Sequence, residues 1–159
     1  MKVLIISDTH GYDDNMFAVI RREQPLDMVI HCGDIERSPG KLIKEANCPV
    51  HLVSGNNDYM LNLPQVDIFD LCGKRVLLLH GHNYRIYREQ TPLFLLAEEN
   101  QADIVMFGHL HEPIIQTDGR ITIVNPGSLT YPRQHGSKPS YVIMNIDYDK
   151  EPEYTVKYL

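Results

Sequence analysis

The chain has 159 residues, of which 43% are hydrophobic and 23% charged, a balance typical of a globular protein rather than a disordered one. This length predicts a single domain over residues 1–159, and the net charge of −6 disfavours binding to a nucleic-acid backbone, which needs a basic surface. Three cysteines without a CxxC pair argue against a disulfide framework. No apolar run approaches the length of a signal peptide core or a membrane span, so we expect a cytoplasmic protein with no membrane partner.

The first third of the chain alternates short apolar runs with amphipathic stretches. Strands are expected at residues 3–6, 28–30 and 50–53, and the first of these runs is short, unbroken and rich in β-branched side chains. Helices are expected from Asp13 or Asp14 to about Glu23, and from Pro39 to about Asn47. This order is typical of α/β proteins, which hold their ligands at the carboxyl ends of the strands.

The rest of the chain is richer in β-structure. Further strands are expected at residues 66–69, 76–79, 104–107, 114–115, 121–124, 141–144 and 154–156, and a helix at 91–101. The βαβα order of the first third of the chain and the β-rich remainder predict an α/β fold in which two sheets pack together with helices outside. The apolar run at 92–97 could supply a homo-oligomeric surface or form the core side of its helix.

Five of the expected strands end in polar side chains that have a glycine beside them. The motifs are Asp8-x-His10-Gly11, Gly33-Asp34, Gly55-Asn56-x-Asp58, His80-Gly81-His82 and Gly108-His109-x-His111. Glycine permits backbone geometry that lets several strand ends crowd around one point. Carboxylate, imidazole and amide donors without a thiolate suit a pair of divalent ions such as Mn²⁺, Fe²⁺ or Zn²⁺. Capping of unrelated strand ends would explain each motif alone, but not all five in this order.

The motif series resembles the calcineurin-like metallophosphoesterase superfamily. Within that superfamily, the short chain, the Ser7–Gly11 opening and the Asn125–Ser128 segment resemble the small YfcE-like phosphodiesterases. The resemblance covers essentially the whole chain. It implies a metallo-dependent phosphatase fold, which is a four-layer α-β-β-α sandwich of two mixed sheets with a dinuclear site at the strand ends.

The resemblance also implies a set of metal ligands and a reaction. It assigns Asp8, His10 and His111 to a first ion, Asn56, His80 and His109 to a second, and Asp34 to a bridge between them. A hydroxide bridging the two ions would attack phosphorus in line, without a covalent enzyme intermediate. Mn²⁺ is the favoured metal, with Fe, Zn, Ni and Mg as alternatives. Two such ions would outweigh the negative charges of both aspartates and the hydroxide, and would thereby attract an anionic substrate.

Position 57 departs from the related protein phosphatases, which carry a histidine thought to protonate the leaving alcohol. Asn57 cannot act as a general acid at neutral pH, which favours diesters or activated esters over phosphomonoesters. Asp58 is expected to orient a ligand histidine. His82 is expected either at the edge of the site or in a structural role. The predicted catalytic group therefore comprises Asp34, Asn56, Asp58 and His82.

Three further residues are expected to meet the substrate: Asn57, Ser128 and Arg133. Gly127 permits a tight turn from which the Ser128 hydroxyl could face the phosphate, although a purely structural turn is equally compatible with the pattern. Tyrosines follow several of the motif turns and could line an aromatic rim or simply pack; they are Tyr12, Tyr59, Tyr84 and Tyr131.

A metal-dependent phosphodiesterase acting on small phosphodiesters or nucleotide-type substrates is the favoured function. A metal-poor protein-interaction scaffold, like the retromer subunit of the same fold, is disfavoured because every ligand position here has a capable donor. Phosphomonoesterase activity is disfavoured because this chain has no general acid at position 57. Nuclease activity is disfavoured because the sequence shows neither a basic stripe nor an extra domain. We therefore expect a small-molecule phosphoester as the partner.

Overall fold

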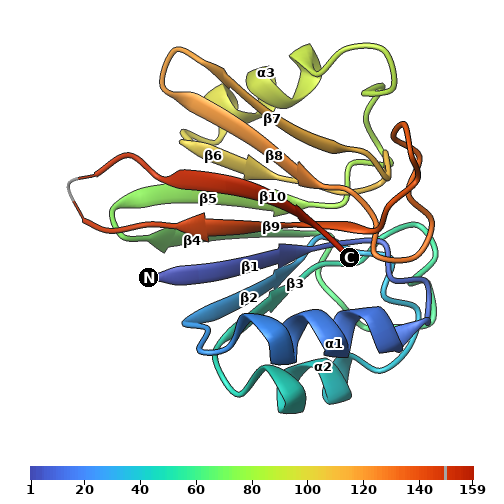
Figure 1. Cartoon of the computed structure of the whole chain (residues 1–159). Coiled ribbons are helices and arrows are strands. Elements are labelled where there is room, and N and C mark those ends of the chain that lie inside the picture. Colours follow the sequence, from blue (N-terminus) through green and yellow to red (C-terminus); the bar gives the residue numbers. More distant parts are fainter. Residues whose placement is uncertain (149) are drawn as a thin grey trace.

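The computed structural model describes residues 1–148 and 150–159. Two five-stranded mixed sheets pack face to face, with helices on their outer faces (Figure 1). The first sheet has the order β10 (Glu153–Tyr158), β9 (Ser140–Asn145), β1 (Lys2–Ile6), β2 (Met28–His31) and β3 (Val50–Leu52). The second has the order β4 (Val66–Leu71), β5 (Lys74–Leu79), β6 (Ile104–Met106), β8 (Ile121–Pro126) and β7 (Pro113–Asp118).

The helices complete the four layers. Helices α1 (Asp13–Glu23) and α2 (Pro39–Ala46) cover the first sheet, and α3 (Thr91–Glu99) covers the second (Figure 1). This arrangement confirms the expected α-β-β-α sandwich. Within the apolar run at 92–97, Leu93 and Ala97 are buried against the second sheet and Leu95 is exposed, so most of the run forms the core side of α3.

The apolar strands are buried on both faces because each one separates two cores. Successive side chains of a strand point to opposite faces of the sheet. On β1, Val3 and Ile5 pack between the two sheets, whereas Leu4 and Ile6 pack beneath α1 and α2. All four side chains are fully buried, as the unbroken apolar pattern predicts.

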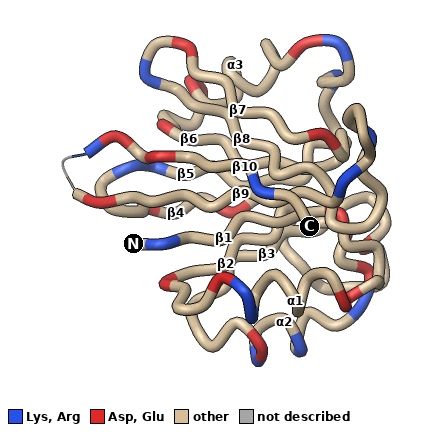
Figure 2. Tube along the Cα trace, in the orientation of Figure 1, with Lys and Arg blue, Asp and Glu red and all other residues tan. Residues whose placement is uncertain are grey.

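The parallel strands bring their carboxyl ends to one side of the sandwich. β1 pairs in parallel with β2, and β2 with β3; in the second sheet, β5 pairs in parallel with β6, and β6 with β8. The loops that follow these strands therefore emerge together (Figure 1). Figure 2 shows acidic and basic residues interspersed along the chain, without a continuous basic stripe on any labelled element. Within the described residues, no helix has both the length and the apolar character needed to cross a bilayer.

A buried carboxylate at the end of α1 ties this helix to the first sheet. The Glu23 side chain is only 6% exposed; it accepts a hydrogen bond from Tyr141 Oη at 2.7 Å and from Lys157 Nζ at 3.0 Å. Lys2 Nζ lies 3.1 Å from the same carboxylate. Burial alone would raise the pKa of Glu23, but these hydrogen bonds and the two lysines lower it to about 2.

We expect Glu23→Gln to lower the free energy of unfolding by about 1–2 kcal/mol at pH 7, since both lysines are partly exposed and solvent screens their charges. The depressed pKa means that this stabilisation is present above the unfolded-state pKa and is lost as the pH falls towards the folded-state value of about 2. Urea denaturation of both proteins at pH 7 and pH 3.5 measures the difference. Glu151→Gln, which removes an exposed pair with Lys74, is the control. An equal gap between wild type and Glu23→Gln at both pH values would contradict the assignment.

Candidate metal centre

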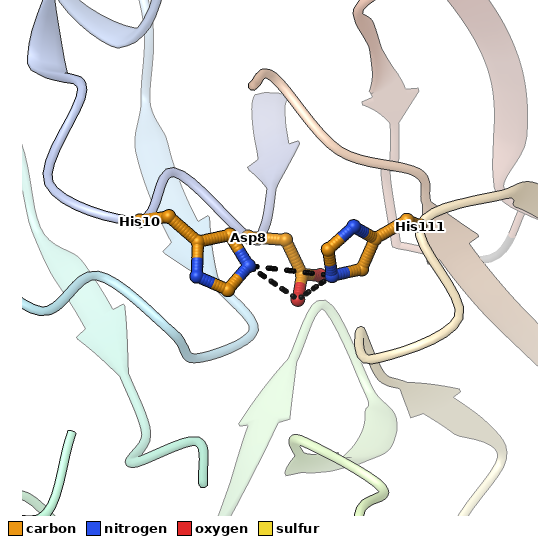
Figure 3. Close-up of side chains that lie close together, drawn as sticks. All are labelled: Asp8, His10 and His111. Carbon is orange, nitrogen blue, oxygen red and sulfur yellow. Dashed lines mark hydrogen bonds and ion pairs between the residues drawn. The ribbon is translucent and has the colours of Figure 1, made fainter. Parts of the chain in front are cut away.

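The loops after β1, β2, β5 and β6 bring carboxylates and imidazoles to one point. Two overlapping groups form, Asp8 with His10 and His111, and Asp8 with Asp34 and His80, and the ligand atoms within each group all lie within 4.8 Å of one another. Figure 3 shows the first group, in which His111 Nε2 lies 3.0 Å and His10 Nε2 lies 3.9 Å from Asp8 Oδ1. The structure thus brings together five of the seven predicted metal ligands.

Asp34 lies between the two sets of histidines. Its Oδ2 atom is 3.4 Å from His80 Nε2 and 3.9 Å from His10 Nε2. Asp8 Oδ1 is in turn 3.9 Å from His80 Nε2. Each carboxylate therefore reaches the histidines of both groups, as expected of residues that surround a pair of cations.

Hydrogen bonds on the outer side of the imidazoles fix which ring nitrogen faces inward. The Nδ1–H groups of His80 and His111 donate to the carbonyl oxygens of Cys32 (2.8 Å) and Tyr131 (2.7 Å). His10 Nδ1–H donates to Glu36 Oε1 at 2.7 Å. Because carbonyl and carboxylate oxygens only accept, Nδ1 carries the proton in all three rings and the Nε2 lone pair points into the cluster.

The atoms that face into the cluster are all acceptors, so they would bind cations but cannot form hydrogen bonds with one another. In the described part of the chain, the buried Asp8 Oδ1 and His80 Nε2 have no hydrogen-bond partner. Leaving such a group unpaired in the interior costs about 1–3 kcal/mol. His10 Nε2 and His111 Nε2 lie 3.3 Å apart, where two lone pairs repel unless a cation lies between them. Divalent ions would satisfy all four atoms.

The two aspartates are held in their ionised form. Burial would raise the pKa of Asp8, but the neighbouring imidazoles of His111 and His80 lower it. Burial opposes ionisation of Asp34 too, yet the adjacent His80 imidazole and the hydrogen bonds from Asn57 keep its pKa well below the ordinary value. In return, the neighbouring carboxylates outweigh burial and raise the pKa of His80.

The backbone of the centre is strained and tightly packed. Five of its non-glycine residues have φ between 46° and 67°, namely Asp8, His10, Asp34, His109 and His111. Such conformations cluster at functional sites, where the surrounding structure enforces them. Two motif glycines permit the close approach: a Cβ atom would lie 2.1 Å from Asp34 Oδ1 at Gly55, and 2.1 Å from Ser7 Oγ at Gly108.

Comparison of the sequence with known families identifies one superfamily. The model for the calcineurin-like phosphoesterase superfamily domain matches residues 1–149. The chain belongs to this superfamily. The chain is similar to the "Probable metallophosphoesterase YsnB" of Bacillus subtilis, at 32% identity over 150 residues covering 94% of this chain and 86% of that protein.

Two further similarities are to a protein named as a phosphodiesterase and to a solved structure. "Phosphodiesterase MJ0936" of Methanocaldococcus jannaschii is 26% identical over 144 residues, covering 80% of this calcineurin-like phosphoesterase and 83% of MJ0936. Vps29 from Entamoeba histolytica, in a crystal structure with zinc, superposes with a TM-score of 0.80 at 20% identity, covering 99% of each chain. At that identity the second similarity shows the fold alone.

The sixth predicted ligand, His109, flanks the cluster. Its backbone N–H donates to Asp8 Oδ2 at 3.1 Å, and its ring centroid lies 5.2 Å from that of His80. Burial, with the nearby charge of His80, lowers the pKa of His109 to about 4, so the ring is neutral at physiological pH. Its Nε2 atom contacts Tyr87 Oη, which leaves Nδ1 as the ring nitrogen for an ion.

The Gly55–Asp58 turn places the two asparagines differently. Asn57 donates its backbone N–H to Asp34 Oδ1 at 2.8 Å and its side-chain Nδ2–H to Asp34 Oδ2 at 2.7 Å. The Asn56 side chain makes no hydrogen bond within residues 1–148 and 150–159, and its role as a ligand remains a prediction. Asn57 therefore contacts the central carboxylate itself, in addition to its predicted role at the substrate.

Asp58 was expected to orient a ligand histidine, but the structure shows it bound to backbone groups instead. This buried carboxylate accepts four backbone N–H groups, from Asp34 (2.7 Å), Ile35 (3.3 Å), Glu36 (2.6 Å) and Gly55 (2.8 Å). The residue is within reach of backbone amides because its turn packs against the loop after β2. Asp58 is thus a positioning residue for Asp34 and does not touch the reacting groups.

Ser128 also differs from its expected role. Its buried hydroxyl donates to the Asp8 carbonyl at 2.8 Å and accepts the N–H groups of Thr130 (3.1 Å) and Tyr131 (2.8 Å), so it fixes the Asp8 backbone and does not face a phosphate. Arg133 is exposed beside the centre, with its backbone N–H donating to the His111 carbonyl at 2.9 Å. The side chain of Arg133 remains a predicted substrate contact.

His82 lies at the edge of the centre. Its ring centroid is 5.5 Å from that of His80 and 6.3 Å from that of His109. Burial and the charge of His80 lower its pKa, so the ring is neutral. Its buried Nδ1 atom has no hydrogen-bond partner among the described residues. Of the two expectations for His82, the structure therefore favours the site edge.

Sequence reasoning missed two residues that contact the predicted ligands, Glu36 and Tyr87. Glu36 follows the Gly33-Asp34 motif by two positions, but no pattern in the sequence shows that its carboxylate reaches His10. Tyr87 lies in the segment between β5 and α3, seven residues after His80, and reaches His109 only through the path of that segment.

We expect Glu36→Gln to weaken binding of one divalent ion by about 10- to 100-fold, because a neutral amide holds the His10 ring less firmly and lowers its basicity. The protein is first freed of metal with a chelator, and calorimetric titration with Mn²⁺ then measures its affinity for the ion. Glu45→Gln, which removes a carboxylate that pairs with Arg21 on the outer helices, should leave the affinity unchanged. Unchanged affinity in Glu36→Gln would rule out this role.

Proposed function

We propose that this protein is a metal-dependent phosphodiesterase that hydrolyses small phosphodiesters or nucleotide-type substrates with two divalent ions, most favourably Mn²⁺. The observation that carries the proposal is the convergence of three Nε2 lone pairs on two ionised carboxylates at the strand ends. The similarity to a protein named as a phosphodiesterase supports the same activity.

Asp8, His10 and His111 would hold the first ion, and Asn56, His80 and His109 the second, with Asp34 between them. When bound, the two ions would acidify a water molecule and neutralise the phosphoryl oxygens. Asp8 and Asp34 supply the negative charge that retains the ions, and Asn57 fixes the rotamer of Asp34 through two hydrogen bonds. His82 and Arg133 border the place where a phosphoryl group would lie and could donate hydrogen bonds to it.

The preference for diesters rests on position 57. The Asn57 amide donates to Asp34 and has no proton to give to a leaving alcohol. An ester with a good leaving group, or a diester that needs less charge neutralisation, is therefore the better substrate.

The proposal is tested by comparing hydrolysis of bis(p-nitrophenyl) phosphate and p-nitrophenyl phosphate. The protein is first freed of metal with a chelator and is then assayed with and without added Mn²⁺. We expect the diester to be cleaved faster, and only with metal. Faster cleavage of the monoester, or hydrolysis that does not depend on metal, would contradict it.

The alternative function is a protein-interaction scaffold with the fold of Vps29. Such a role does not explain the ionised carboxylates at the candidate metal centre. A protein-interaction surface does not require ionised, buried carboxylates surrounded by imidazole lone pairs. A protein that bound no metal and cleaved neither ester would favour the scaffold. A nuclease acting on long nucleic acid is disfavoured by the interspersed charges in Figure 2.

A further inference from the structure

A hollow of about 560 Å³ adjoins the metal centre on the side of His109. It is lined by residues 82–85 and 87–89, all from the segment between β5 and α3. His82 belongs to both the hollow and the edge of the centre, so a ligand in the hollow lies next to the ions. The volume is within the range of sites that enclose small organic ligands.

The segment that forms the hollow is anchored to the core. Ile86 is fully buried among the side chains between the second sheet and α3, and a Cβ atom at Gly81 would lie 2.9 Å from its Cδ1. Backbone hydrogen bonds from Tyr84 N to Gly81 O and from Ile86 N to Tyr84 O, both 3.0 Å, close the turn. Arg85, Tyr87 and Arg88 are exposed around this anchor.

The charge of the hollow is positive in a chain whose net charge is −6. Among the described residues, Arg85 and Arg88 have no carboxylate within 4.0 Å; Arg37, Arg75 and Arg133 share this property, whereas Arg21, Arg22 and Arg120 are paired. Glu89 is the one acidic residue in the described lining. Two unpaired guanidinium groups suit a phosphate, which they can bind through paired hydrogen bonds.

The hollow also offers aromatic faces. Tyr84 and Tyr87 both line it, and the Tyr87 ring lies 5.2 Å from the His109 ring at an angle of 62°. Tyr87 therefore stands between the metal centre and the hollow. Tyrosine rings at such a position can stack with a nucleobase.

On the basis of the proposed phosphodiesterase activity, we propose that this hollow binds a nucleotide arm of the substrate, with the nucleoside against Tyr84 and Tyr87 and a second phosphate at Arg85 and Arg88. The substrate class is then a dinucleotide-type diester that carries a terminal phosphate, such as the 5′-phosphorylated dinucleotide pApA. Hydrolysis adds one water molecule: its oxygen bonds to phosphorus, the bond from phosphorus to the 3′ oxygen breaks, and a proton passes to that oxygen, giving two molecules of AMP.

The other ester arm would lie on the opposite side of the centre. A smaller hollow of about 290 Å³ is lined by His10, Gly11, Tyr12, Glu36, Arg37 and Tyr131. It has one arginine, and its Glu36 carboxylate would repel a phosphate. The terminal phosphate is therefore assigned to the hollow at Arg85 and Arg88.

The test compares pApA with ApA, which lacks the terminal phosphate, on the Mn²⁺-loaded enzyme. We expect wild type to favour pApA by about ten-fold in kcat/KM, and the double variant Arg85→Gln/Arg88→Gln to lose most of this preference. Hydrolysis of bis(p-nitrophenyl) phosphate by the double variant should stay within about two-fold of wild type, because this substrate has no second phosphate. Lys41→Gln/Lys44→Gln on α2 removes the same charge from an exposed surface elsewhere and should retain the preference.

Binding of pApA and ApA to the chelated protein, measured by calorimetry, gives a readout that does not need catalysis. Tighter binding of pApA that depends on Arg85 and Arg88 supports the inference. Equal binding of the two dinucleotides, or a preference that survives in the double variant, overturns it. Cleavage of bis(p-nitrophenyl) phosphate without any preference for pApA over ApA would contradict the nucleotide site but not the phosphodiesterase proposal. Arginine-dependent binding of pApA without cleavage of any ester would remove the phosphodiesterase proposal and leave the nucleotide site.

Discussion

Asp34→Asn is expected to lower Mn²⁺-dependent diester hydrolysis by about 10²- to 10³-fold or more without unfolding the protein. The substitution keeps the shape of the side chain but removes its charge. Asp34 Oδ2 lies within 4 Å of both His10 Nε2 and His80 Nε2, so its carboxylate reaches histidines that are assigned to both ions. A neutral amide lacks the negative charge that would hold two cations close together, so it binds them more weakly.

Steady-state kinetics with bis(p-nitrophenyl) phosphate measures the loss, and thermal denaturation checks the fold. Asp118→Asn, at the exposed turn between β7 and β8, is the matched control and should keep full activity. Activity of Asp34→Asn within ten-fold of wild type would show that Asp34 does not hold the ions.

The second large effect is expected at Asp58. Asp58→Asn should lower the free energy of unfolding by about 2–4 kcal/mol, because four backbone N–H groups lose a charged acceptor in the interior and an amide N–H₂ group now faces some of them. The loop that carries Asp34 loses its support at the same time. We therefore also expect a lower affinity for Mn²⁺ at temperatures where the variant is still folded.

Urea denaturation and Mn²⁺ titration of the same preparation separate the two consequences. Asp70→Asn, which changes an exposed carboxylate on β4, should affect neither. A variant at position 58 with wild-type stability and wild-type affinity would refute the positioning role.

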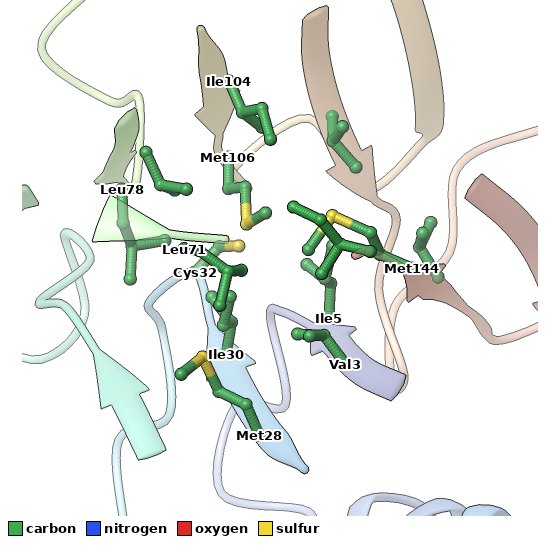
Figure 4. Close-up of a cluster of buried hydrophobic side chains, with 14 of the residues drawn as sticks. Val3, Ile5, Met28, Ile30, Cys32, Leu71, Leu78, Ile104, Met106 and Met144 are labelled. Atoms are coloured by element: carbon green, nitrogen blue, oxygen red, sulfur yellow. The ribbon is translucent and has the colours of Figure 1, made fainter. Parts of the chain in front are cut away.

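The fold was largely predictable because its strands are short and apolar on both faces. The pattern at Val3–Ile6 predicts a strand buried on both faces, and Figure 4 shows Val3 and Ile5 of β1 with Met28 and Ile30 of β2 in the core between the sheets. The convergence of the candidate metal ligands followed from the same rule, since parallel strands present their carboxyl ends together.

The supporting contacts of the centre were not predictable in the same way. Asp58 and Ser128 bind backbone groups of other loops, and a sequence pattern records the types of side chains but not the directions of backbone N–H and C=O groups. The adjacent Asn56 and Asn57 are chemically identical, so only the path of the turn decides which one contacts Asp34. Glu36 is an ordinary loop carboxylate until the fold places His10 beside it.

The number of metal ions that the chain binds tests the central claim most directly. Chelated protein is titrated with Mn²⁺ and the bound metal is counted by atomic emission, while electron paramagnetic resonance reports whether the ions interact magnetically. The account predicts two Mn²⁺ per chain with a coupled signal in the wild type, and loss of the coupled signal in Asp34→Asn. One ion per chain, two uncoupled ions, or no bound metal would contradict a dinuclear centre at the ends of these strands.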